Sequence, residues 1–311
     1  MIRFCKIISI TALFFVSGCG SFVERIAKAQ EQGENRRGIT YYVGGAGPIG
    51  NVGSWDIPRG LTDAGYEGFV EVFTWQGWTH AGDQMNLARN RSKGAELAAE
   101  IKAYRRRYPN QKINIIALSA GTGIATFALE YLPEGVEVDH VIYLGCSLSS
   151  SYDMTRALRR VNGGLYCIHS FRDPILNNVV WYTGTVDRSA GDEGIAGMEG
   201  FRLPRHKGAD SERQYAKIRN VPYRTEFASV GYDGGHTDTT TREFVRDYLA
   251  PVILNNEKTL LGDSYRERFD STPRPTTRPT TRPAPDRKEA VMKKLGPEEP
   301  IDPDSRRTAE R

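Results

Sequence analysis

The sequence predicts an α/β fold in which a mostly parallel central sheet carries helices on both faces. Two observations lead to this prediction. Short apolar runs typical of strands alternate with longer helical stretches from about residue 38 to residue 265. The strand-like runs are apolar almost without a break, a pattern typical of parallel strands that are buried on both faces. Repeated strand–helix units of this kind build a parallel sheet between two helical layers.

Six runs are predicted to be strands, because β-branched and aromatic residues dominate them. In chain order they are Ile39–Val43, Phe69–Trp75, Ile113–Ala117, Val138–Leu144, Leu165–His169 and Tyr223–Val230. The last run ends just before a loop that contains several glycines, so it is expected to be the final strand of the sheet.

Three stretches between and after these strands are predicted to be helices. The first spans about residues 84–108, where apolar side chains recur at the spacing of one helix face. The second, residues 120–132, is rich in small residues. The third follows Thr240, which is expected to form a capping box with Glu243, each side chain accepting the backbone N–H of the other residue. Its predicted buried face consists of Phe244, Tyr248 and Leu249.

The first 18 residues are predicted to be an export signal that is separate from the fold. Arg3 and Lys6 precede a short apolar run, Ile7–Val16, which is too short to span a bilayer as a helix. An ordinary secretory signal has the same basic start and apolar run, so only the residues after the run can distinguish a lipoprotein signal from it.

The sequence Val-Ser-Gly-Cys at residues 16–19 resembles the lipobox of bacterial lipoprotein precursors, with Val16 where leucine usually stands. The resemblance implies that Cys19 is diacylated, becomes the new N-terminus and anchors the chain to a membrane. Several acyl chains bind a bilayer firmly, at about 0.8 kcal/mol per buried methylene. Because Gly20 follows in place of aspartate, the resemblance favours the periplasmic face of the outer membrane in the bacterial cell envelope. The alternative is a secretory signal with a chance cysteine.

Composition divides the rest of the chain into three parts. Residues 19–37 are polar and charged and are interpreted as a tether. Residues 38–265 hold the predicted strands and helices and form the domain. Residues 266–311 are expected to be a disordered tail, because a Pro/Thr/Arg repeat at residues 271–285 lacks the apolar side chains that a core needs.

Charge argues against a nucleic-acid partner. The chain has 42 Lys and Arg and 38 Asp and Glu. When residues 1–18 and 270–311 are left out, 30 residues of each sign remain, so the body is neutral. Proteins that bind nucleic acid carry a basic patch that neutralises phosphates, and a balanced body does not predict one.

Cysteines and histidines give no metal signature. No CxxC pair and no cluster of histidines and carboxylates with ligand spacing occurs, so neither a metal nor another cofactor is predicted. Export to an oxidising compartment allows a disulfide between Cys146 and Cys167. Both cysteines lie in apolar runs, however, which favours two buried free thiols.

A strand-to-helix turn at residues 117–121, Ala-Leu-Ser-Ala-Gly, is the most informative motif of the chain. A serine with a small residue two positions away on each side is typical of a sharp corner that lifts the Ser119 hydroxyl above the sheet edge. The N–H of Ala120 then lies at a helix N-terminus, where it can stabilise an oxyanion. No Lys-Ser/Thr pair follows the glycines, which excludes a phosphate-binding P-loop.

A serine nucleophile requires a base and an acid that orients the base. Of the five histidines, His236 alone lies in a loop between the last predicted strand and the closing helix. Asp173, just past the strand Leu165–His169, is the predicted acid. Asp153 is a weaker candidate because it lies well beyond its nearest strand, and Asp187 is weaker because it follows only a short apolar run.

Ser119, Asp173 and His236 follow one another in the serine–acid–histidine order of the α/β-hydrolases. With the strand–helix pattern, residues 38–255 resemble that family and its esterases and lipases, although Ala117 stands where glycine is usual. The resemblance implies a Ser-His-Asp triad that cleaves carboxylic esters through an acyl-enzyme. It also implies a small-molecule or lipid-like ester as the substrate.

The loop after the first strand is similar to the glycine loop that supplies an oxyanion donor in esterases and lipases. It reads Gly-Gly-Ala-Gly at residues 44–47. Glycines let backbone N–H groups approach a substrate oxygen closely. The expected donors are Gly45 or Ala46 together with Ala120, and the sequence does not choose between the first two.

Several alternatives stay open. One alternative to an esterase is a non-catalytic envelope lipoprotein that uses the fold as a binding module. Another is a peptidase or thioesterase of the same fold. Trp75 either lines a substrate pocket or belongs to the core. Residues 179–219 are long for a connector and are expected to contribute to a cap over the site. The oligomeric state is not predicted.

Overall fold

The computed structural model describes residues 35–46, 52–76, 86–180, 184–188, 194–204, 208–262 and 265. All of them belong to Met1–Ser271, the first of two compact units of the chain. The predicted signal, Cys19, nearly all of the tether and the predicted tail lie outside the described residues. Within the described ranges, no helix combines the length and the apolar character that crossing a bilayer requires.

Six parallel strands form one sheet in the order β2-β1-β3-β4-β5-β6. The strands are β1 (Ile39–Val43), β2 (Phe69–Phe73), β3 (Ile113–Leu118), β4 (His140–Leu144), β5 (Leu165–His169) and β6 (Ile218–Pro222). The first five coincide with predicted strands to within two residues at each end. The α/β class with a parallel sheet is therefore confirmed.

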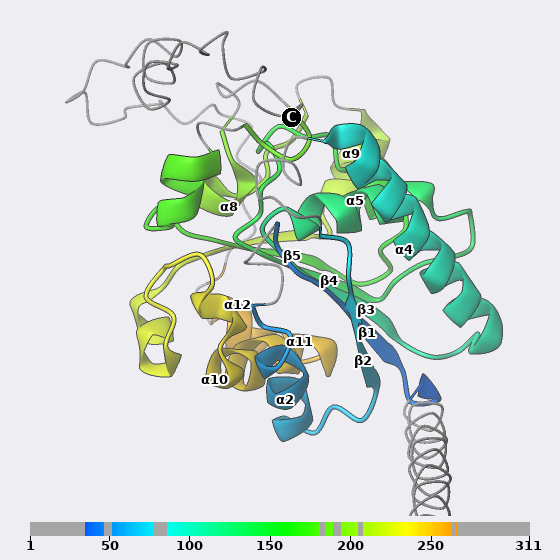
Figure 1. The fold of residues 1–311 in the computed structure, drawn as a ribbon, viewed down its shortest axis with the longest axis horizontal. Coiled ribbons are helices and arrows are strands. Elements are labelled where there is room, and N and C mark those ends of the chain that lie inside the picture. Colours follow the sequence, from blue (N-terminus) through cyan, green and yellow to red (C-terminus); the bar gives the residue numbers. More distant parts are fainter. Residues whose placement is uncertain are drawn as a thin grey trace, which may run out of the picture. The chain divides into compact units, whose positions relative to one another are not determined.

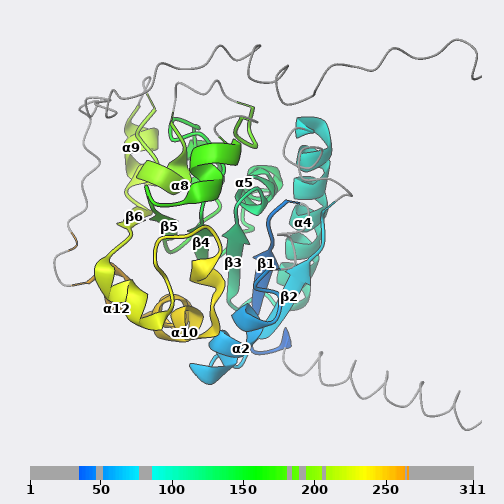
Figure 2. The ribbon, with the colours of Figure 1, turned by 60° about the vertical axis from the view of Figure 1, so that its left-hand side comes forward.

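Helices cover both faces of this sheet (Figure 1). One layer contains α4 (Leu87–Arg107), α5 (Gly121–Tyr131), α6 (Thr155–Leu158), α8 (Ala196–Glu199) and α9 (Ala209–Tyr215). The other contains α2 (Asp56–Asp63), α10 (Arg242–Phe244), α11 (Ala250–Ile253) and α12 (Lys258–Leu261). Figure 2 shows the sheet between the two layers. Within the predicted cap region, α8 packs against β5 and α9 against α6.

Alternate side chains along each strand enter two separate cores. In β1, Tyr41 and Val43 face the core beneath α4 and α5, whereas Tyr42 faces the core over α2 and α11. In β3, Ile115 and Ile116 divide in the same way. Because both faces are covered, neither side of a strand needs polar residues, and this explains the unbroken apolar runs of the sequence.

The sixth strand is not the one that the sequence predicts. β6 is Ile218–Pro222, whereas most of the predicted strand Tyr223–Val230 is a 3₁₀ helix, η4 (Thr225–Val230). In η4 only Phe227 is buried, and its ring stacks on that of Tyr232. The prediction was wrong because β6 lies at the sheet edge, where polar residues are tolerated, while Tyr223, Phe227 and Val230 give the segment around η4 a strand-like composition.

The closing helix starts without the predicted capping box. α10 follows Thr241, which makes no side-chain cap. Thr240 lies in a preceding 3₁₀ turn, η5 (Asp238–Thr240), and its hydroxyl donates to the Thr237 carbonyl at 2.7 Å. That bond directs the hydroxyl back along the chain and away from the helix. The predicted burial holds for Phe244 and Leu249, and Tyr248 is partly buried.

Candidate active site

The carboxyl ends of the parallel strands meet at one edge of the sheet, and the predicted site residues follow these ends. In the strand register, Val43 lies opposite Ala117, Leu118 opposite Leu144, and Leu144 opposite Ile168. Loops that leave β1, β3, β4 and β5 therefore start side by side. Clefts at this edge are the usual ligand sites of open α/β sheets.

Ser119 occupies the turn between β3 and α5 in a strained backbone conformation. Its φ is 54°, in the left-handed region that side chains rarely adopt, and its N–H donates to the Leu144 carbonyl at 2.9 Å. Holding a residue other than glycine there costs on the order of 1–3 kcal/mol. The side chain is almost fully buried, with 3% of the residue exposed. The sharp corner expected from the sequence is thus present.

Gly121 explains why a small residue is needed two positions after the serine. A Cβ at this position would lie 2.3 Å from both the Val43 and the Gly44 carbonyl oxygens. The first turn of α5 therefore packs directly against the loop that leaves β1. This contact brings the start of α5 against Val43 and Gly44, the residues just before Gly45 and Ala46, the other predicted oxyanion donors.

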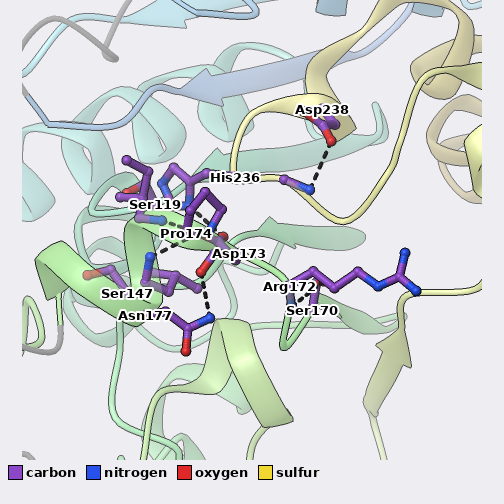
Figure 3. A network of polar contacts seen from close by, with 12 residues as sticks. Ser119, Ser147, Ser170, Arg172, Asp173, Pro174, Asn177, His236 and Asp238 are labelled. Carbon is purple, nitrogen blue, oxygen red and sulfur yellow. Dashed lines mark hydrogen bonds and ion pairs between the residues drawn. The ribbon is translucent and has the colours of Figure 1, made fainter.

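Asp173 and His236 form a buried pair. The Nδ1 atom of His236 lies 2.6 Å from Asp173 Oδ2, and the two residues are 4% and 2% exposed. Figure 3 draws this pair together with Ser119. The other carboxylate oxygen, Oδ1, accepts N–H groups of Ile175 and Leu176, each at 2.9 Å. Three donors thus hold the carboxylate in one orientation.

The second ring nitrogen of His236, Nε2, is buried and has no hydrogen-bond partner among the described residues. The structure accordingly does not join Ser119 Oγ to this nitrogen by a hydrogen bond. Such bonds are often long before substrate binds. His140 Nδ1 is also buried without a partner, so the missing bond alone does not identify a site; what distinguishes His236 is that its other nitrogen is bonded to a buried carboxylate at the edge where Ser119 lies.

Two residues that hold His236 were missed by sequence reasoning. Asp238 Oδ2 accepts the N–H groups of Gly235 at 2.8 Å and Asp233 at 3.2 Å, which fixes the loop around the histidine (Figure 3). Gly145, directly after β4, has a φ of 51°. A Cβ on Gly145 would lie 3.0 Å from His236 Nδ1. A glycine after a buried strand was the available signal for Gly145, but glycines follow other strands as well.

The structure also places the remaining candidates. Asp153 Oδ1 accepts the nearby Thr155 N–H, and Asp187 Oδ1 accepts the Ser149 N–H, so neither aspartate is the acid at His236. Trp75 is 1% exposed and belongs to the core beneath α4 and α5, which decides between the two roles that the sequence left open. Gly47, the last residue of the glycine loop, lies outside the described residues.

Cys146 and Cys167 are both free and buried. Burial, together with the neighbouring Cys146 thiol, raises the pKa of Cys167 well above its ordinary value. Unreactive thiols of this kind behave as small core residues. Among the residues described, no group of three His, Cys, Asp or Glu side chains could hold a metal ion.

Comparison with protein-family models found no match for this sequence, and comparison with curated proteins found no relative of significant similarity. The site must therefore be interpreted from its own geometry. What that geometry shows is a strained serine, a buried aspartate–histidine pair and a glycine loop at the same edge of a parallel sheet.

Proposed function

We propose that the protein is a serine hydrolase of the α/β-hydrolase fold that cleaves carboxylic esters. The observation that carries the proposal is the buried Asp173–His236 pair, whose Nε2 atom has no partner among the described residues. A carboxylate that accepts a hydrogen bond from Nδ1 leaves Nε2 unprotonated and able to accept a proton.

His236 and Ser119 are connected indirectly, through the residues at the end of β4. The Ser119 N–H donates to the Leu144 carbonyl, and Gly145, the next residue, packs against the His236 ring. In the proposed reaction, Ser119 Oγ bonds to the ester carbonyl carbon while its proton passes to His236 Nε2. Collapse of the tetrahedral intermediate breaks the bond to the alcohol, which leaves with that proton. Water then repeats the sequence and releases the acid.

The developing oxyanion requires hydrogen-bond donors that are already in place. We assign this role to the N–H of Ala120, at the start of α5, together with Gly45 or Ala46. The packing of Gly121 on the Val43 and Gly44 carbonyls supports the assignment, because it brings the two donor segments together. Each donor of this kind is worth about 3–4 kcal/mol to the transition state.

A fluorophosphonate probe tests the proposal, because it labels only an activated serine. The wild-type protein should be labelled and should hydrolyse p-nitrophenyl butyrate. Ser119→Ala should lose both properties, whereas Ser229→Ala, at an exposed serine of η4, should keep them. A folded wild-type protein that is neither labelled nor active would favour the non-catalytic binding module. Faster cleavage of aminoacyl amides or thioesters would favour the peptidase or thioesterase.

The N-terminal sequence supports a second part of the proposal. We propose that the enzyme is exported, loses residues 1–18 and is held at the cell envelope by acyl chains on Cys19, with the outer membrane as its location. An ester-cleaving site on such an anchor would meet lipid-like or small-molecule esters of the envelope.

A further inference from the structure

The glycine loop after β1 is tied down by two side chains that follow β2. Trp75 Nε1 donates to the Gly44 carbonyl at 2.8 Å, and Gln76 Nε2 donates to the Gly45 carbonyl at 3.2 Å. These two residues therefore hold successive carbonyl groups of the loop. Both glycines are buried, so the loop carbonyls depend on protein partners more than on water.

The two side chains are themselves fixed. Gln76 Oε1 accepts the Trp75 N–H at 3.2 Å, so both ends of the amide are engaged. Arg89, in the first turn of α4, donates from Nη2 to the Trp75 carbonyl at 2.6 Å. The indole ring is 1% exposed and packed in the core. A rigid pair of donors thus holds an otherwise permissive glycine segment.

The hydrogen bonds from Trp75 and Gln76 to the two loop carbonyls, here called the clamp, also fix the direction of the neighbouring N–H groups. In a trans peptide, the C=O of one residue and the N–H of the next point in opposite directions. Fixing the Gly44 carbonyl on Trp75 therefore directs the Gly45 N–H away from that side chain. Fixing the Gly45 carbonyl on Gln76 does the same for the N–H of Ala46.

These two N–H groups have no acceptor among the described residues, although Gly45 and Ala46 are both buried. Buried backbone donors without a partner are rare, because each costs about as much as a lost hydrogen bond. Two of them in sequence, directly after the Val43 and Gly44 carbonyls that pack against Gly121 of α5, are available to an acceptor that arrives with a ligand.

We propose that Trp75 and Gln76 are positioning residues that hold the N–H groups of Gly45 and Ala46 for the oxyanion formed at Ser119. This inference rests on the proposed hydrolase function and deepens it. Two adjacent glycines have no strong backbone preference, so without the clamp the loop would lose its preorganised donors. Neither side chain touches the substrate in this arrangement.

Two variants remove one donor each; the first is isosteric with the original side chain, and the second is smaller. Gln76→Glu replaces the amide donor with a carboxylate that repels the Gly45 carbonyl. Trp75→Phe keeps an aromatic ring in the core and lacks Nε1. The matched control is Tyr104→Phe, which also deletes one bond from a buried aromatic ring to a backbone carbonyl, that of Asn35 at 2.6 Å. Asn35 precedes β1, at the end opposite the glycine loop.

The assay uses purified protein and p-nitrophenyl butyrate, with active sites counted by fluorophosphonate labelling carried to completion. Rates are expressed per labelled site, so partly unfolded protein does not contribute. Affinity for an aryl trifluoromethyl ketone is measured in parallel. This inhibitor forms a tetrahedral oxyanion on the serine, so its binding reports the oxyanion donors directly.

In Gln76→Glu and Trp75→Phe we expect kcat to fall about 10- to 100-fold, less than the 10²–10³-fold cost of deleting a donor outright. KM should change less than about threefold, and ketone affinity should fall by the same factor as kcat. Tyr104→Phe should keep kcat and ketone affinity within about twofold of wild type.

Two outcomes would overturn the clamp and leave the hydrolase intact: variants that match Tyr104→Phe, or variants in which KM rises while kcat and ketone affinity stay unchanged. Failure of the proposed function gives a different result, because the wild-type protein itself would then be neither labelled nor active.

Discussion

Replacing Asp173 with asparagine tests the proposed triad most sharply, because the structure fixes what the new amide must do. In the wild type, Oδ1 accepts the N–H groups of Ile175 and Leu176, and Oδ2 lies 2.6 Å from His236 Nδ1. An asparagine can keep only one of these arrangements. If its oxygen stays on the two backbone donors, its NH₂ group faces Nδ1. If the amide flips, the NH₂ group faces two N–H donors.

The first orientation satisfies more groups, so His236 must then accept a hydrogen bond at Nδ1 and carry its proton on Nε2. This tautomer cannot take a proton from Ser119. For a Ser-His-Asp triad, the same exchange lowers kcat about 10⁴-fold, which at 1.36 kcal/mol per factor of ten is about 5.4 kcal/mol of transition-state stabilisation. The fold should survive, with a change of less than about 2 kcal/mol in the free energy of unfolding, because the side chains are nearly isosteric.

The measurement compares kcat for p-nitrophenyl butyrate and the melting temperature of Asp173→Asn with those of Asp153→Asn and Asp187→Asn. The last two aspartates each accept a backbone N–H, of Thr155 and Ser149, away from His236, so their variants should keep kcat within about threefold. The reasoning is refuted if Asp173→Asn keeps more than a tenth of the wild-type kcat, or if another aspartate variant loses more.

Three further changes probe the packing of the site and the anchor. Gly145→Ala should lower kcat at least 100-fold in steady-state kinetics, because its Cβ would lie 3.0 Å from His236 Nδ1 on a backbone with φ of 51°; wild-type kinetics would contradict this packing. Gly121→Ala should lower both kcat and the melting temperature, because a Cβ 2.3 Å from two backbone carbonyls forces the loop to move. The free energy of unfolding should fall by about 1–3 kcal/mol. Gly208→Ala, where nothing lies within 4 Å, is its control, and equal effects would rule out the explanation. Cys19→Ser should abolish membrane attachment and the lipid increment in the intact mass; unchanged attachment would mean that Cys19 is not the anchor.

Much of this fold could be predicted because its strands are central and parallel. β3 and β4 are buried on both faces, so their sequences are apolar without a break and stand out from the helices around them. The edge strand β6 carries polar residues, and the aromatic pattern of Tyr223–Val230 was mistaken for it. β2, at the other edge, is also only partly buried, but it was recognised because four of its five residues are apolar, whereas β6 contains Arg219 and Asn220.

The site residues also differ in how far the sequence alone could predict them. Ser119 and His236 could be proposed from local context, because a serine between small residues and a histidine in a glycine-rich loop are visible in the sequence. Asp173 could be placed past a strand, but its bond to His236 joins positions 63 residues apart and needed the structure. The bonds of Trp75 and Gln76 to the glycine loop depend on which strands are neighbours, and the sequence contains no signal for strand order.

The ends of β3 and β4 show why the strain at Ser119 argues for function. Leu118 and Leu144 are register partners, and the next residues, Ser119 and Gly145, have nearly equal positive φ values of 54° and 51°. At Gly145 the chain uses glycine, the residue that adopts this conformation without cost and leaves room for His236. At Ser119 the same backbone carries a side chain, at a cost of about 1–3 kcal/mol that a second glycine would avoid. Arg188 and Asn255 also have positive φ, so strain alone is not specific, but of the three only Ser119 lies at the end of the strand next to β4, whose following residue packs against the buried His236 ring. This combination supports the proposal that the Ser119 hydroxyl is kept for its reactivity.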